Sequence, residues 1–145
     1  MDTSEEVKIW RRIRGEDPGI IDGLPALAAS ALSQAALYGA MARRSQGQIR
    51  QLLQQLQSRE LSNARCIKGI YRLVSGQSLS AATVPPSQEA TEIALRRSYG
   101  RSLKALNAYE ARSDHGEYGA VFRLMADGQR ESCLKIAELA ALTEV

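Results

Sequence analysis

The sequence predicts an all-α protein, and three observations lead to this fold class. Aromatic residues make up only 5% of the chain, whereas Ala, Leu, Arg and Gln, which favour helix over sheet, are abundant. Apolar residues recur at alternating spacings of three and four along several long segments. Short turns and one longer polar linker separate these segments. A chain of 145 residues can bury a core as one domain, so we expect a four-helix bundle.

The first 23 residues are predicted to form a separate N-terminal segment, 1–23, before the bundle. Val7, Trp10 and Ile13 are spaced by threes within residues 4–14, and Gly15 follows as a stop signal. We expect a short amphipathic helix here, whose Trp10 packs on the bundle or on a second subunit.

The bundle is expected over 24–145, with its first helical hairpin at 24–76. Pro25 suits the first turn of a helix that runs to about residue 44, and a tight connection at 45–47 brings the next helix back antiparallel. Gly76 ends that helix. The inward face of the first helix is predicted to comprise Leu24, Ala28, Ala31, Ala35, Tyr38 and Ala42. The second helix is predicted to bury Ile49, Leu53, Leu56, Glu60, Asn63, Ile67, Ile70 and Val74.

A polar linker at 77–86 leads to the second hairpin, 87–142. Together with Ser87 it has eleven residues, which span at most roughly 37 Å when extended. This is close to the length of about 42 Å of the preceding helix, so the segment can cross most of the bundle from end to end. Ser87 is a suitable N-cap for a helix to about residue 112, and the last helix starts near Glu117 after a turn that contains His115. The third helix is predicted to bury Leu95, Tyr99, Ser102, Leu106 and Tyr109. The fourth is predicted to bury Tyr118, Phe122, Met125, Gln129, Ser132, Ile136 and Leu139.

The two hairpins repeat one pattern. Ala31 precedes Tyr38 by seven residues, as Ser102 precedes Tyr109. Likewise, a polar pair three residues apart occupies each second helix, at 60 and 63 and at 129 and 132. The chain therefore uses one helical hairpin twice.

Glu60 and Asn63 are unexpected within a buried apolar stripe, because burying polar groups is unfavourable unless they are hydrogen-bonded. Their spacing is that at which helical bundles present a Glu-x-x-His pair of metal ligands. In this chain an Asn stands where the His would be.

With these residues in view, the chain resembles a rubrerythrin-type protein of the ferritin-like superfamily over residues 24–142. The segments that carry the resemblance are 38–44 (YGAMARR), 60–65 (ELSNAR), 99–102 (YGRS), 108–112 (AYEAR) and 129–132 (QRES). The resemblance implies a bundle with one long crossover and a central di-iron site, held in each hairpin by one Glu and one Glu-x-x-His. The positions that correspond to these ligands are Ala31, Glu60, Asn63, Ser102, Gln129 and Ser132.

Only Glu60 retains a ligand of the implied site. One carboxylate without imidazole cannot hold two iron ions, so we expect no cofactor, no metal and no catalytic residue. A one-residue slip of the last helix would bring in Glu131, but the apolar seam argues against it. We instead expect a buried polar network flanked by Tyr38 and Tyr109, with a small cavity left by the shortened side chains. Glu60 is expected to accept from Gln129, a tyrosine hydroxyl or water, or to have a raised pKa.

Charge and cysteine content indicate a cytoplasmic protein. Cys66 and Cys133 are too few for a disulfide framework, and the acidic N-terminus resembles no signal peptide.

No Asp or Glu occurs between Asp22 and Glu60, although several arginines do. A basic half of this kind can attract nucleic acid, but the arginines are scattered, which favours a solvated face.

These observations lead to a principal functional hypothesis and two alternatives. The principal one is a homodimeric, non-catalytic scaffold or interaction module that has lost most of its di-iron ligands. The first alternative is a rubrerythrin-like di-iron oxidoreductase or peroxidase. The second is a binder of a small ligand or of nucleic acid. No membrane association is expected, and the partner protein is unknown.

Overall fold

The computed structural model describes residues 22–86, 88–114 and 116–144. These residues form helices and connecting segments, without a strand among them. The long helices are α2 (Leu24–Arg43), α3 (Gly47–Ser75), α4 (Thr91–Ala111) and α5 (Gly119–Thr143), and a short 3-10 helix, η2 (Gly116–Tyr118), precedes α5. The all-α, four-helix prediction is therefore confirmed for the described part of the chain.

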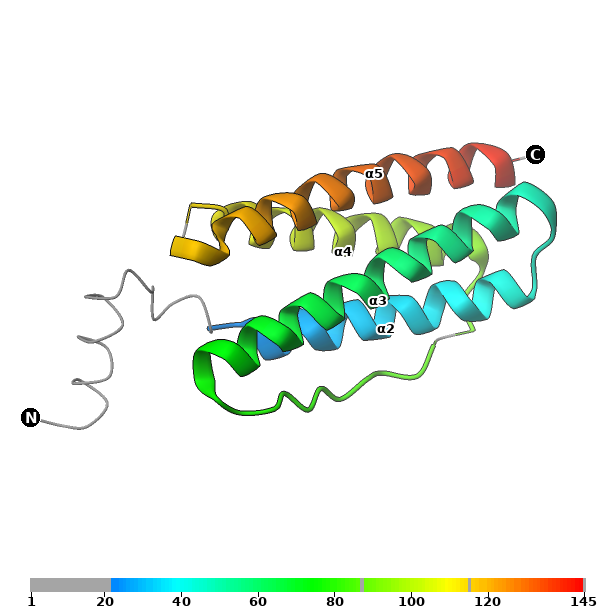
Figure 1. Cartoon of the computed structure of the whole chain (residues 1–145). Helices are drawn as coiled ribbons and strands as arrows, with labels where there is room; N and C mark the ends of the chain where they lie inside the picture. Colours follow the sequence, from blue (N-terminus) through cyan, green and yellow to red (C-terminus); the bar gives the residue numbers. More distant parts are fainter. Residues whose placement is uncertain (1–21, 87, 115, 145) are drawn as a thin grey trace, which may run out of the picture.

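The helices pair as two antiparallel hairpins laid side by side (Figure 1). Helix α2 packs mainly on α3, and α4 mainly on α5. The hairpins meet through α3 against α5 and α2 against α4. The segment between α3 and α4 runs along the outside of the bundle from one end to the other. Two short turns and one long crossover thus connect the helices, as the sequence predicts.

Glycines mark two of the helix boundaries for steric reasons. Gly76 caps α3 with a left-handed φ of 74°, and its N–H donates to the Arg72 carbonyl at 2.8 Å. Gly119 begins α5 where a Cβ atom would lie 2.4 Å from the Ser113 carbonyl oxygen. Any larger residue at 119 would therefore force the second hairpin turn open.

Helix α4 begins later than predicted. It starts at Thr91 with Ala90 as its N-cap, whereas the sequence suggested a start at 87, and Ser87 itself lies outside the described residues. The Glu89 side chain is paired with Arg97, eight residues along the chain. Eight helical residues would separate these positions by about 12 Å along an axis, so the pair holds 88–90 off the helix.

The predicted inward faces are largely those that the structure buries. Every predicted position of α2 is buried, and on α3 only the terminal Ile49 and Val74 are partly exposed. The prediction for α4 was wrong at one position: Tyr99 is 42% exposed, and its neighbour Ser98 is buried instead. Tyr118 and Leu106 are half-buried.

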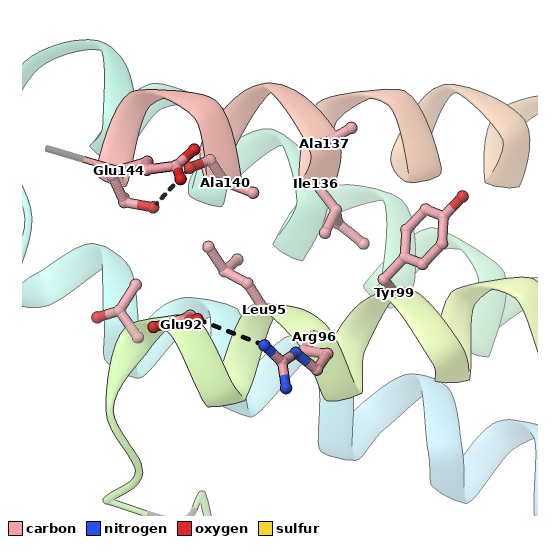
Figure 2. A pocket seen from close by; sticks show the side chains of 10 residues that line it. Glu92, Leu95, Arg96, Tyr99, Ile136, Ala137, Ala140 and Glu144 are labelled. Carbon is pink, nitrogen blue, oxygen red and sulfur yellow. Dashed lines mark hydrogen bonds and ion pairs between the residues drawn. The ribbon is translucent and has the colours of Figure 1, made fainter.

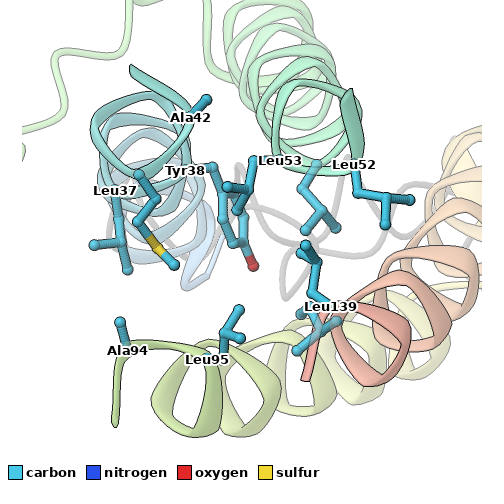
Figure 3. Close-up of a cluster of buried hydrophobic side chains, with 11 residues drawn as sticks. Leu37, Tyr38, Ala42, Leu52, Leu53, Ala94, Leu95 and Leu139 are labelled. Atoms are coloured by element: carbon cyan, nitrogen blue, oxygen red, sulfur yellow. The ribbon is translucent and has the colours of Figure 1, made fainter. Parts of the chain in front are cut away.

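The core consists of two apolar clusters. The first lies between the end of α2 and the start of α4 and includes Tyr38, Leu53, Leu56, Leu95 and Leu139, several of which point toward one another in Figure 3. The second occupies the other end and includes Leu24, Ile67, Tyr109, Phe122 and Met125. In the second cluster the rings of Tyr109 and Phe122 stack with centroids 6.5 Å apart. Polar residues fill the space between these clusters.

Three sequence predictions lie outside the described residues: the short helix at 4–14 with Trp10, its stop at Gly15, and the turn position of His115. Within the part that is described, none of the helices combines the length and apolar character needed to cross a bilayer.

Candidate functional site: a buried polar centre

Five of the six positions that correspond to the implied ligands meet at the middle of the bundle, and the sixth, Ser132, is buried on the same helix as Gln129. Helix α2 contributes Ala31, α3 contributes Glu60 and Asn63, α4 contributes Ser102, and α5 contributes Gln129 and Ser132. All six are buried, and Gln129 is fully inaccessible. The spacing argument from the sequence therefore identified a real convergence of side chains from all four helices.

Gln129 is the hub of a hydrogen-bond network at this centre. Its Nε2 donates to Glu60 Oε1 at 3.1 Å and to Ser102 Oγ at 2.6 Å. Its Oε1 accepts from Asn63 Nδ2 at 3.0 Å. Both amide hydrogens and the carbonyl oxygen of Gln129 are thereby used. The predicted network is confirmed for these four residues, and the predicted Glu60–Gln129 hydrogen bond is among them.

Ser132 is buried beside the network but takes no part in these hydrogen bonds. Cys133, its neighbour on α5, donates its thiol to Ser102 Oγ at 3.5 Å. The thiols of Cys133 and Cys66 are both free, as predicted, although Cys66 is only partly buried.

The environment of Glu60 favours its neutral form. Burial raises the pKa of this carboxyl from 4.5 to about 7, because a charged carboxylate loses its hydration there. The hydrogen bond from Gln129 and the positive charge of Arg59 act in the opposite direction and offset only part of this rise. Glu60 therefore holds its proton at a higher pH than an exposed glutamate does.

The two predicted tyrosines flank the centre. Burial, reinforced by the nearby Glu60 carboxyl, raises the pKa of Tyr38 and of Tyr109 above the ordinary value, so both hydroxyls remain protonated. Tyr38 forms a hydrogen bond with Ser98, which partly opposes the rise in its pKa. Both rings line the same small cavity as Glu60 and Gln129.

Sequence reasoning missed one member of this region, Gln34. It is 4% exposed, and its Oε1 accepts from Ser98 Oγ at 3.2 Å, while its Nε2 has no acceptor among the described residues. The signal was present, because Gln34 lies three residues after Ala31 and four before Tyr38, on the same helix face. A polar residue on this alanine-rich face gives no hydrophobic signal, so the apolar periodicity does not include Gln34.

A cavity of about 10 Å³ lies at the centre, as the loss of ligand volume predicted. It is bounded by residues that include Ala31, Gln34, Tyr38, Glu60 and Tyr109. A space of this size admits about one water-sized atom. The centre thus combines polar walls, a titratable carboxyl and an amide that lacks an acceptor.

The donor set does not fit the two iron ions that the resemblance implies. Among the described residues, no three His, Cys, Asp or Glu side chains gather at one point. More directly, Gln129 directs both amide hydrogens at the two groups that a cation would need as ligands, Glu60 and Ser102. Amide and hydroxyl oxygens also lack the charge required to compensate two metal ions. Glu131, the residue that a register slip would supply, instead points outward and pairs with Arg59 at 3.4 Å.

A groove of about 530 Å³ also lies on the surface between α4 and α5 (Figure 2). Leu95 and Ile136 form its floor and Tyr99 its side, while Glu92 pairs with Arg96 at 3.4 Å along its rim. The misassigned Tyr99 therefore borders a surface groove rather than the core.

No protein-family model, curated protein or solved structure is significantly similar to the chain.

Proposed function

We propose that this chain is a ferritin-like bundle of rubrerythrin type that has lost its di-iron chemistry and serves as a non-catalytic scaffold or interaction module. The observation that carries the proposal is the Gln129 hub, whose amide group forms three hydrogen bonds where the family places metal ligands. A buried hydrogen-bond network of this kind stabilises a bundle and holds its helices in register.

The connectivity supports the family assignment. Two hairpins joined by one end-to-end crossover is an arrangement of ferritin-like bundles, whereas a simple up-and-down bundle has three short loops. The positions that repeat between the two hairpins are also all buried, as a metal site derived from an ancestral duplication would require. As part of the proposal, the protein acts in the cytoplasm as a homodimer.

Iron loading tests the proposal directly. We expect anaerobic incubation with Fe(II), followed by desalting and metal analysis, to leave well below one iron per chain. Glu60→Gln provides the matched control, because iron that persists in this variant is bound elsewhere. Two irons per chain in the unmodified protein, lost in Glu60→Gln, would overturn the proposal in favour of a di-iron oxidoreductase.

A variant in which the metal ligands are restored provides a positive control for this test. Replacing Ala31, Ser102 and Gln129 by Glu, and Asn63 and Ser132 by His, would recreate the family's six ligands together with Glu60. If the backbone is a ferritin-like bundle, this variant is expected to take up two irons per chain. Helical, folded protein that still binds none would contradict the family assignment.

A further inference from the structure

A groove beneath the crossover segment is distinct from the α4–α5 groove. We call it the linker groove, and it is formed by α2, by the linker and by α4, with Ser30, Leu37, Val84, Pro85, Arg97 and Arg101 among its walls. Its volume is about 410 Å³, which lies within the usual range for small-molecule sites.

The linker is fastened across this groove at two points. The Val84 N–H donates to Ser33 Oγ on α2 at 3.1 Å, and Glu89 pairs with Arg97 on α4. A segment that lacks helix or strand is therefore tied to both helices that flank the groove. The wall that it forms is defined before any ligand arrives, which favours binding.

The charges on the groove walls do not balance. Glu89 neutralises Arg97, whereas Arg101 forms no hydrogen bond or ion pair within the described residues. Apolar side chains of Leu37, Val84 and Pro85 line the same space. One unpaired guanidinium beside an apolar wall suits a ligand with a single negative charge and an apolar body.

The linker groove adjoins the buried cavity. Ser30 and Arg101 line both spaces. On the inner side, Gln34 lines the cavity and its Nε2 lacks an acceptor, although the residue is 4% exposed. An unsatisfied buried donor is unfavourable, and a ligand oxygen would satisfy it. The missing partner of Gln34 Nε2 is therefore an acceptor, and Arg101, which lines both spaces, carries a positive charge.

We infer that the linker groove binds a small organic monocarboxylate. Its carboxylate would pair with Arg101 and place one oxygen in the inner cavity near Gln34, and its apolar body would lie along Leu37, Val84 and Pro85. The inner cavity admits about one oxygen-sized atom, which matches one carboxylate oxygen. This activity goes beyond a scaffold role, and it requires no metal.

Octanoate is a suitable probe, titrated into the full-length protein and followed by ¹H–¹⁵N NMR. We expect saturable shifts at the backbone amides of Ser33, Val84 and Arg101 and at the side-chain amide of Gln34. Octanol, which has the same chain length without the charge, is expected to bind at least about tenfold more weakly, because it lacks the charge-assisted contact. Inorganic phosphate is expected to bind weakly, because it cannot use the apolar wall.

Two arginine variants locate the site. Arg101→Gln should weaken octanoate binding by at least about tenfold, since among the described residues of the groove wall its guanidinium is the only charge without an ion-pair partner. Arg96→Gln is the matched control, because Arg96 is exposed on the same helix, pairs with Glu92 and lines the other groove. It should leave octanoate affinity unchanged. Absence of saturable shifts, equal affinity in Arg101→Gln, shifts confined to the α4–α5 groove, or phosphate binding as tight as octanoate would each overturn the inference.

Discussion

The two hairpins are alike at their turns and different at their centres. In each, the residue after the first helix donates its N–H three positions back, from Arg44 to Met41 and from Arg112 to Tyr109. At the centre, however, the first hairpin supplies the acid Glu60, and the second supplies Gln129 and Ser102. Two of the three central hydrogen bonds cross between hairpins. Neither hairpin can satisfy its own polar groups, so the network ties one to the other.

Of the substitutions that test this difference between the hairpins, removing the charge of Glu60 should change the free energy of unfolding most. The pKa of Glu60 is 4.5 in the unfolded chain and about 7 in the folded protein, so the folded state binds the proton more tightly. The free energy of unfolding therefore falls as pH rises from about 4.5 through about 7, by about 3 kcal/mol in total. Glu60→Gln cannot ionise and should lack this fall.

Urea denaturation at pH 5 and pH 8 measures the difference. We expect Glu60→Gln to be more stable than the unmodified protein by about 3 kcal/mol at pH 8 and by less than about 1 kcal/mol at pH 5. A parallel pH profile for both proteins would show that Glu60 is ionised and well solvated in the folded state.

The two buried glutamines offer the next test, one from each hairpin. Gln129→Leu removes three hydrogen bonds and leaves Asn63 and Glu60 without their partner, so we expect a loss of about 2 kcal/mol at pH 5. Gln34→Leu is the matched control, because it removes one hydrogen bond from Ser98 but also an amide nitrogen that has no acceptor. Its loss should be below about 1 kcal/mol. Equal losses for both variants would contradict the role of Gln129 as the hub.

The contrast between these glutamines also shows which features of the centre could be predicted from the sequence. The convergence at the centre was predictable because a heptad-like spacing fixes which residues share a helix face. On that basis Gln129 was one of three partners predicted for Glu60, beside a tyrosine hydroxyl and water. On α4 the same rule is ambiguous, since Leu95 to Ser98 and Leu95 to Tyr99 both fit the spacing. The hydrogen bond from Ser98 to Gln34, which joins two helices, accompanies burial of the smaller residue.

The late start of α4 has a similar origin. Ser87 carries a good local capping signal, but the Glu89–Arg97 pair and the contact of Val84 with Ser33 fasten the linker along the bundle. Such contacts depend on the position of α2, which no local pattern contains. The linker groove was unpredictable for the same reason, because α2, which forms one of its walls, lies far in the sequence from the linker and α4.

Ala31 and Ser102 occupy corresponding positions on the first helix of each hairpin. Exchanging the residue types at these positions is expected to change the free energy of unfolding less than the substitutions above. Ser102→Ala removes one acceptor of Gln129 Nε2 and should lower the free energy of unfolding by about 1 kcal/mol. Ala31→Ser adds a hydroxyl that lines the central cavity, where it can meet polar groups, so its effect should be smaller than that of Ser102→Ala. Thermal unfolding monitored by circular dichroism compares the variants. A larger loss for Ala31→Ser would indicate that the first hairpin packs more tightly at the centre than the second.

The smallest effect is expected outside the network, where the hairpins also touch. Arg59 on α3 lies over Gly128 on α5, where any Cβ atom would clash with the guanidinium, and it pairs with the exposed Glu131 at 3.4 Å. Because water screens this pair, Glu131→Gln should change the free energy of unfolding by less than about 0.5 kcal/mol in urea denaturation. Gly128→Ala should also change it little, since the atoms that a Cβ atom would meet belong to the flexible end of the Arg59 side chain, which can move aside. If Glu131→Gln instead matched Gln129→Leu, the surface pair rather than the buried amide would hold the hairpins together.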